Sequence, residues 1–291
     1  MTGVGRHARG AALMLVLWLI ALLTALVGAF ALSARIESMQ GQVLARGLIA
    51  AQAARAGQEY SITRLNDPDP TRQWRPDGRP YRWTYAGAEV EVRIVDELGK
   101  VDLNAADAPL LTALFRAVGI EPDVATGLAS AILDWRDPDI LTQPQGGAED
   151  PDYAAAGRAY GAKDGPFDTV AEVEQVLGMT PPLYVLAATH LTVYSGQAQP
   201  QADFASGPVL TALGQDGTAI VAARERQGGP LPGEAGSGFV GAGSGTYSID
   251  SRARLADGRA AALRTVLRVG GNGLPGSVYT PLRWEEGTST R

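Results

Sequence analysis

The chain has 291 residues, with 31 acidic and 25 basic side chains and a net charge of −6. It contains no cysteine and only two histidines, which excludes disulfides, thiolate chemistry and multi-histidine metal sites. The charge is unevenly distributed, because residues 96–232 carry 19 acidic and 7 basic groups, whereas residues 1–95 carry 7 acidic and 11 basic groups. A strongly acidic middle section therefore lies between two mildly basic ends.

The first predicted element is an uncharged apolar helix over residues 11–32. Twenty-two residues in a helix span roughly 33 Å, enough to cross a bilayer core of about 30 Å. Arg6, His7 and Arg9 precede this segment, so the positive-inside rule predicts a cytoplasmic N-terminus. A cleaved secretory signal ending at Ala29-Phe30-Ala31 is the alternative, but signal sequences have apolar regions of only about 7–15 residues.

The helical pattern continues beyond the apolar segment. Residues 33–66 contain no proline, and small or apolar residues recur at three- and four-residue steps from Ile36 to Ala54. We therefore expect one helix of about 50 residues that ends near Asp67-Pro68-Asp69-Pro70. A stripe of small side chains favours close packing of its later turns.

Four strands are predicted in two pairs at the two ends of the remaining chain. Residues 81–85 and 90–95 are separated by Ala86-Gly87-Ala88. Residues 247–255 and 260–269 are joined by Asp257-Gly258, a strong hairpin signal. A long helix packed on an antiparallel sheet gives an α+β module, and the acidic middle section is predicted to be inserted into it.

The insert is predicted to be helical and to contain a repeat. Residues 103–114 align with residues 202–213 without gaps and match at six of twelve positions. Each copy begins with a candidate helix cap, Asn104 or Asp203. A second helix is expected after each copy, over residues 122–136 and 217–226.

Three further segments complete the predicted insert. A polar loop over residues 137–166 precedes a helix over residues 169–177, for which Asp168 is the expected cap. Residues 228–245 are rich in glycine and are interpreted as a flexible return to the sheet.

The helical repeat raises the possibility of nucleic-acid binding, because Val118-Gly119-Ile120 resembles the turn of a helix-hairpin-helix motif. Phosphate binding requires basic groups. Residues 96–200 contain five Lys or Arg against sixteen Asp or Glu, so the charge excludes nucleic acid as a partner.

Six carboxylates form the most informative cluster: Asp134, Asp137, Asp139, Glu149, Asp150 and Asp152. A loop with carboxylates near both ends can surround a hard divalent cation such as calcium. A solvated acidic loop is the alternative, and the residues alone leave both interpretations open. A carboxylate hydrolase is also conceivable. No catalytic partner set accompanies the carboxylates, and His190 is expected to be a packed residue at a strand edge, so we expect no enzyme.

The N-terminal pattern resembles that of type IV pilins and pseudopilins: a short basic leader ending in Arg9-Gly10, then an apolar helix that continues amphipathically. In that class a prepilin peptidase cuts after the glycine, which makes Gly10 and Ala11 the expected processing site. The class normally has glutamate at the fifth mature position, and this chain has Leu15 there.

The combined motifs resemble the type II secretion system minor pseudopilin K family. The resemblance covers most of residues 6–195 and rests on the leader, on Leu15 and on a series of motifs: Asp102-Leu103-Asn104, Asp134-Trp135-Arg136-Asp137-Pro138-Asp139, Gly147-Ala148-Glu149-Asp150 with Tyr153, Pro166-Phe167, Leu177-Gly178-Met179-Thr180-Pro181 and Leu191-Thr192-Val193-Tyr194-Ser195.

The resemblance implies a pilin-like fold with an inserted all-α domain of the SAM-like type. It also implies a structural role at the tip of a periplasmic pseudopilus, in contact with I- and J-type minor pseudopilins, prepilin peptidase and other type II secretion components. The family binds calcium in its inserted domain, which favours the metal interpretation of the acidic loop; the expected ligands are Asp137, Asp139, Glu149 and Asp150.

The expected organisation is a leader over residues 1–10, a membrane span over 11–34, a pilin-like helix and first strands over 35–95, the insert over 96–232, and a glycine-rich linker with the last strands over 233–291. The expected location is the bacterial inner membrane, crossed once, with the N-terminus cytoplasmic and the rest periplasmic. The alternative function is a minor pilin of a type IV pilus or a competence-type filament.

Overall fold

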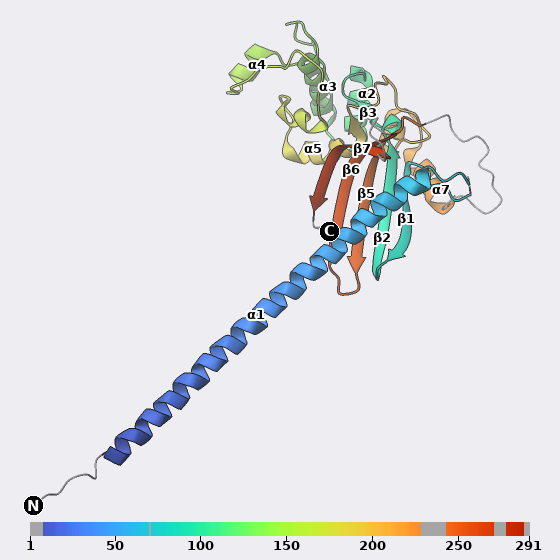
Figure 1. Ribbon diagram of the computed structural model, residues 1–291. Helices are drawn as coiled ribbons and strands as arrows, with labels where there is room; N and C mark the ends of the chain where they lie inside the picture. The colour runs from blue at the N-terminus through green and yellow to red at the C-terminus, as the bar shows by residue number, and fades with distance from the viewer. Residues whose placement is uncertain (1–7, 70, 228–242, 271–277, 288–291) are drawn as a thin grey trace, which may run out of the picture. The chain divides into compact units, whose positions relative to one another are not determined.

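A computed structural model describes residues 8–69, 71–227, 243–270 and 278–287. The chain divides into two compact units, residues 1–50 and residues 51–291. The helix α1, Ala8–Leu65, contributes to both units (Figure 1). It has 58 residues, against the roughly 50 predicted, and it ends two residues before the predicted stop at Asp67.

The first unit consists of the N-terminal part of α1. Residues 12–49 are all exposed, and the most apolar 18-residue window has a mean hydropathy of 2.6. Among the described residues, α1 is the one helix long and apolar enough to cross a membrane. Eighteen helical residues span about 27 Å, close to the thickness of a bilayer core, so α1 is consistent with a single-pass membrane anchor.

The second unit contains a five-stranded antiparallel sheet of order β1-β2-β5-β6-β7 (Figure 1). Its strands are β1 Asp77–Tyr85, β2 Ala88–Asp96, β5 Thr246–Leu255, β6 Ala260–Val269 and β7 Tyr279–Gly287. The four predicted strands are confirmed, and β6 has the predicted bounds. The strand β1 begins at Asp77, four residues earlier than predicted, and β7 was not predicted.

The last turns of α1 pack closely on one face of this sheet. The Ser251 hydroxyl on β5 donates a hydrogen bond of 2.7 Å to the Ala54 carbonyl. Gly57 permits this approach, because a Cβ atom there would overlap Ser251 and the Val90 side chain on β2. The predicted α+β class, a long helix on an antiparallel sheet, is confirmed.

The helical section is inserted between two strands that pair with each other, since Asp96 at the end of β2 lies opposite Tyr247 on β5. Its helices are α2 Ala108–Ala117, α3 Pro122–Arg136, α4 Asp150–Ala155, α5 Pro181–Ala187, α6 Gly207–Ala212 and α7 Gly217–Gln227. Three 3₁₀ helices, η1 Glu97–Gly99, η2 Val170–Gln175 and η3 Ala188–His190, and the short parallel strands β3 Val101–Asp102 and β4 Leu191–Thr192 complete it. The glycine-rich residues 228–242 lie outside the described residues.

The two copies of the internal repeat make matching contacts. The guanidinium of Arg136 in α3 donates to the carbonyl oxygens of Leu103 and Ala106, just before α2. Arg224 in α7 makes the same contacts before α6, at 2.6 Å each, with the carbonyl oxygens of the aligned residues Ala202 and Ala205. The two copies are therefore helical hairpins with the same arginine clamp.

The predicted helix caps Asn104 and Asp203 are wrong. The residue that caps α2 is Asp107, whose carboxylate accepts a hydrogen bond of 2.9 Å from the Leu110 amide. The Asn104 side chain instead bonds to both backbone groups of Phe167, which ties α2 to a distant loop. The residue before α6 is Ser206, in the position equivalent to Asp107.

Two other local predictions also need correction. The helix expected over residues 169–177 is the shorter 3₁₀ helix η2, with Thr169 rather than Asp168 at its cap position. The Asp168 carboxylate is instead bonded to Lys163, at 2.7 Å. The predicted polar loop over residues 137–166 contains the short helix α4, whose start at Glu149 matters for the site below.

Candidate metal centre

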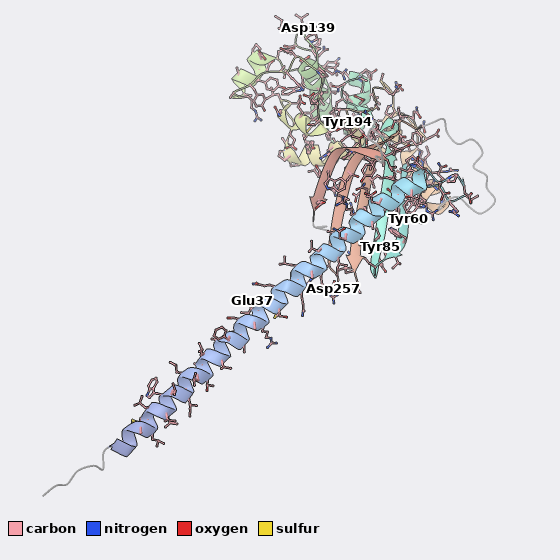
Figure 2. All side chains as sticks on the ribbon, in the orientation of Figure 1. Glu37, Tyr60, Tyr85, Asp139, Tyr194 and Asp257 are labelled. Carbon is pink, nitrogen blue, oxygen red and sulfur yellow. The ribbon has the colours of Figure 1, made fainter. Side chains whose placement is uncertain are left out.

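Three of the predicted carboxylates meet at one point of the insert. Asp137, Asp139 and Glu149 each place a carboxylate oxygen within 4.8 Å of the other two. Asp137 follows the last turn of α3, and Glu149 is the N-cap residue of α4. Figure 2 labels Asp139 at the end of the insert that lies away from the sheet. The ends of α3 and α4 and the loop after α3 therefore supply these three carboxylates, which we call the acidic trio.

Two neighbouring carboxylates fold the loop between the helices. Asp134 is buried, and its carboxylate accepts hydrogen bonds from the Gln143 amide at 3.2 Å. Gly147 lies against the same carboxylate, where a Cβ atom would overlap it. Asp152 accepts a bond of 3.0 Å from the Glu149 amide in a capping box at the start of α4. Asp134 and Asp152 therefore fix the conformation of the loop without belonging to the trio.

The trio contains buried oxygen atoms without hydrogen-bond donors in the described part of the chain. Glu149 is 4% exposed, and its Oε1 and the Oδ1 of Asp137 have no hydrogen-bond partner. Burial, with repulsion from Asp134 and Asp137, raises the pKa of Glu149 to about 7. Burial also raises the pKa of Asp137, and the Asp139 charge adds to this effect.

This arrangement fits a hard divalent cation. A buried, unpaired carboxylate destabilises the folded state, and a bound cation would offset that cost. The donors are all oxygen atoms, which calcium and magnesium prefer over nitrogen or sulfur ligands. The acidic trio can therefore hold such an ion.

The fourth predicted ligand, Asp150, lies outside the acidic trio. Its Oδ1 accepts a hydrogen bond of 3.1 Å from the Ala162 amide, so this carboxylate faces the segment after α4. A residue that the sequence analysis missed is Asp164, whose charge raises the pKa of both Asp137 and Glu149. Asp164 is an isolated acidic residue 25 positions after Asp139, and no local pattern connects it with the cluster.

Residues 93–196, which contain the acidic trio, match the family model described as type II secretion system protein K. They form a type II secretion protein K domain. This finding confirms the resemblance predicted from the sequence motifs.

Two curated relatives carry the name type II secretion system protein K. The protein from Klebsiella pneumoniae is 30% identical over 204 residues, which cover 62% of this chain and 61% of the relative. The protein from Pseudomonas aeruginosa is 30% identical over 155 residues, which cover 49% of this chain and 46% of the relative. The chain thus spans less than two thirds of the length of either relative.

A solved structure shares the fold. It is a chain of the GspK-GspI-GspJ complex from the enterotoxigenic Escherichia coli type 2 secretion system, with a TM-score of 0.55 and 16% identity. The match covers 87% of this chain and 100% of that chain. The chain therefore shares its fold with this solved structure over most of its length.

The structure also places the predicted processing site and His190. Gly10 and Ala11 fall in the first turn of α1. His190 of the protein K domain is bonded to the Ser206 hydroxyl at 2.9 Å, and burial, with Lys100 nearby, lowers its pKa to about 4. It is a packed, neutral histidine next to β4, as predicted.

The raised pKa of Glu149 predicts a pH dependence of the ion-free protein K domain. The folded state holds a proton up to about pH 7, whereas the unfolded chain releases it near 4.5, so this group's stabilisation is present below pH 4.5 and is lost as pH rises toward 7. In calcium-free buffer, Glu149→Gln should melt several degrees above the unsubstituted protein at pH 8 and at nearly the same temperature at pH 4. Equal melting temperatures at both pH values would contradict the raised pKa.

Proposed function

We propose that this chain is a minor pseudopilin at the tip of the periplasmic pseudopilus of a type II secretion system. The observation that carries this proposal is the protein K domain inserted between β2 and β5 of a sheet packed on α1. Such an insert is too bulky to fit between subunits within a fibre, which favours the tip over a repeated position in a pilus. The role is structural, in protein export, and involves no catalysis.

The proposed topology follows from charge and hydropathy. The apolar part of α1 anchors the chain in the inner membrane, with Arg6 and Arg9 on the cytoplasmic side and residues after about 34 in the periplasm. Leu15 has no charge to neutralise the N-terminal amine of a neighbouring subunit, a pairing thought to drive repeated addition in this class. This difference also supports a capping role, with one copy per tip.

Processing gives a first test of the proposed class. A prepilin peptidase should remove residues 1–10 and leave Ala11 as the new N-terminus, with the membrane helix intact. The intact mass of the protein extracted from membranes measures the cut, and Gly10→Leu should leave the precursor uncut. A mature chain beginning at Leu32, after Ala29-Phe30-Ala31, would identify ordinary signal cleavage and contradict the pseudopilin assignment.

The proposed partners are I- and J-type minor pseudopilins. The support is the solved complex, whose chains are named GspK, GspI and GspJ and whose GspK-like architecture this chain shares. Co-expression of the full chain with the I- and J-type proteins of the same genome should give a complex that co-purifies from detergent-solubilised membranes. Elution of this chain without either protein would contradict the tip assignment.

Calcium is the proposed ion of the acidic trio. The donors are carboxylates on a loop and two helix ends, a set that suits the flexible coordination of calcium better than the strict octahedron of magnesium. The periplasm equilibrates with external calcium, so a weak site with a Kd of roughly 10⁻⁴–10⁻³ M would be filled. The ion would offset most of the negative charge of the trio and connect the end of α3 to the start of α4.

A further inference from the structure

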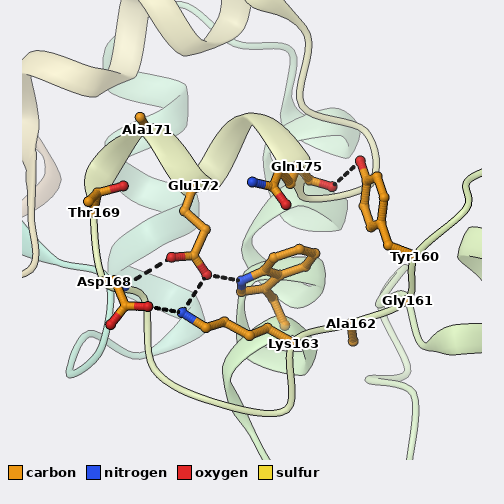
Figure 3. A pocket seen from close by; sticks show the side chains of 10 residues that line it. Tyr160, Gly161, Ala162, Lys163, Asp168, Thr169, Ala171, Glu172 and Gln175 are labelled. Atoms are coloured by element: carbon orange, nitrogen blue, oxygen red, sulfur yellow. Dashed lines mark hydrogen bonds and ion pairs between the residues drawn. The ribbon is translucent and has the colours of Figure 1, made fainter.

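Residues 158–165 contact Asp150, next to the acidic trio, and four of them line an open pocket of about 550 Å³ (Figure 3). These residues form no helix or strand. One wall of the pocket comes from this segment, through residues 160–163, and the facing wall comes from Trp135 and from Asp168 and the residues of η2. We call residues 158–165 the linking segment.

One side of the linking segment contacts the surroundings of the acidic trio. Asp150, which directly follows Glu149, accepts the 3.1 Å hydrogen bond from the Ala162 amide. Gly161 lies so close to the same carboxylate that a Cβ atom would overlap it. Asp164 adds its charge to those of Asp137 and Glu149. The position of this side of the linking segment therefore depends on the net charge of the carboxylates around the trio.

The other side of the linking segment holds the pocket together. The Lys163 ammonium bridges two carboxylates, that of Asp168 at 2.7 Å and that of Glu172 at 2.8 Å (Figure 3). The Tyr160 hydroxyl donates to the Gln175 carbonyl at 3.2 Å. Glu172 also accepts a bond of 3.0 Å from the Trp135 indole, so the wall is tied to the core of the insert.

We propose that a cation in the acidic trio holds the linking segment in place and thereby forms the pocket beside Lys163. This inference rests on the proposed calcium site and adds to it a regulatory consequence. Without the ion, the charges of Asp137, Glu149 and Asp164 repel one another. Within the described residues, no helix or strand hydrogen bonds hold the linking segment against that repulsion. Segments of this kind open at low free-energy cost. The surface that the insert presents at this pocket therefore depends on calcium.

The chain offers a specific probe of this coupling, because Lys163 and Lys100 are its only lysines. Burial lowers the pKa of Lys163, but its bonds to Asp168 and Glu172 outweigh this effect and raise it, which reduces the reactive free amine. Lys100 is buried and bonded to Glu97 at 2.8 Å, near the sheet rather than the trio. It serves as the internal reference.

The experiment compares acetylation of the two lysines in the full chain in detergent, followed by peptide mass spectrometry, with millimolar calcium or with EGTA. We expect Lys163 to react about fivefold faster in EGTA, the effect of a modest loss of local stability. Lys100 reports on global unfolding, so the quantity compared is the Lys163 rate relative to the Lys100 rate. Melting temperatures of the same samples report separately on calcium binding.

Two variants of Asp150 separate the coupling from binding of the ion. Asp150→Ala removes the acceptor for the Ala162 amide, so calcium should still raise the melting temperature but no longer slow acetylation of Lys163. Asp150→Asn keeps an acceptor oxygen and should restore the protection.

A calcium-dependent melting temperature with an unchanged Lys163 rate would overturn the coupling and leave the calcium site intact. If calcium changes neither the melting temperature nor the Lys163 acetylation rate of the unsubstituted protein, both the calcium site and the coupling are overturned. Loss of the melting shift in Asp150→Ala would make Asp150 a ligand and overturn the proposed route.

Discussion

Removing calcium should lower the melting temperature of the full chain by about 1–6 °C. A ligand that binds only the folded state adds about 0.4–1.4 kcal/mol of stability at 1 mM when its Kd is roughly 10⁻³–10⁻⁴ M. One kcal/mol corresponds to about 2–4 °C for a folded unit of 150–250 residues. The buried oxygens of Glu149 and Asp137 that lack donors are the physical source of the effect. Thermal scans in detergent, with millimolar calcium, magnesium or EGTA, measure it.

Variants assign this effect to the acidic trio. Asp139→Asn or Glu149→Gln should abolish the difference between calcium and EGTA, because each removes one negative charge from the trio. Asp257→Asn is the matched control, since it removes a carboxylate from the β5–β6 turn, outside the insert (Figure 2). It should leave the calcium effect unchanged. Equal melting temperatures in calcium and EGTA for the unsubstituted protein would identify the loop as a solvated acidic surface.

The elements that the sequence predicted correctly carry strong local signals. Pro122 marks the start of α3, and Asp257-Gly258 marks the turn before β6; both elements have their predicted bounds. In β7 the signal is weak, because Pro281 interrupts the strand pattern and most of its residues are exposed at the sheet edge. The sequence therefore predicted four strands and the insertion between them but not the fifth strand.

The candidate site was predictable as a cluster but not as a set of ligands. Sequence spacing brings Asp137 and Asp139 together, yet it does not tell which way a carboxylate points in the first turn of a short helix. Asp150 follows Glu149 and still faces Ala162. Asp164 reaches the cluster through a turn with a φ of +54°, a conformation that no sequence rule assigns to aspartate at this position. The direction of a side chain, and its approach to residues far away in the sequence, are fixed only by the packing of the folded chain.

Replacing Arg136 should destabilise the insert more than any change at its surface. The guanidinium donates to the carbonyl oxygens of Leu103 and Ala106, and hydrogen bonds to a charged group contribute about 1.5–3 kcal/mol each. Arg136→Ala leaves both acceptors without this donor, so we expect a loss of about 3 kcal/mol or more. Thermal or urea unfolding of the full chain in detergent, followed by tryptophan fluorescence, measures the loss.

The arginine clamp also couples the fold of the insert to its ion. Arg136 is the last residue of α3, and Asp137 of the acidic trio follows it directly. Arg136→Ala should therefore weaken the calcium effect as well as stability, whereas Arg224→Ala, in the second copy of the repeat, should destabilise the insert and leave the calcium effect in place.

Arg136→Lys should recover only part of the loss, because a single ammonium cannot reproduce the planar fork across two carbonyls. Arg116→Ala, an exposed position in the last turn of α2, is the control and should change stability by less than about 0.5 kcal/mol. An Arg136→Ala protein as stable as the control would show that the clamp contributes no net stability and that the repeat is held by its apolar core alone.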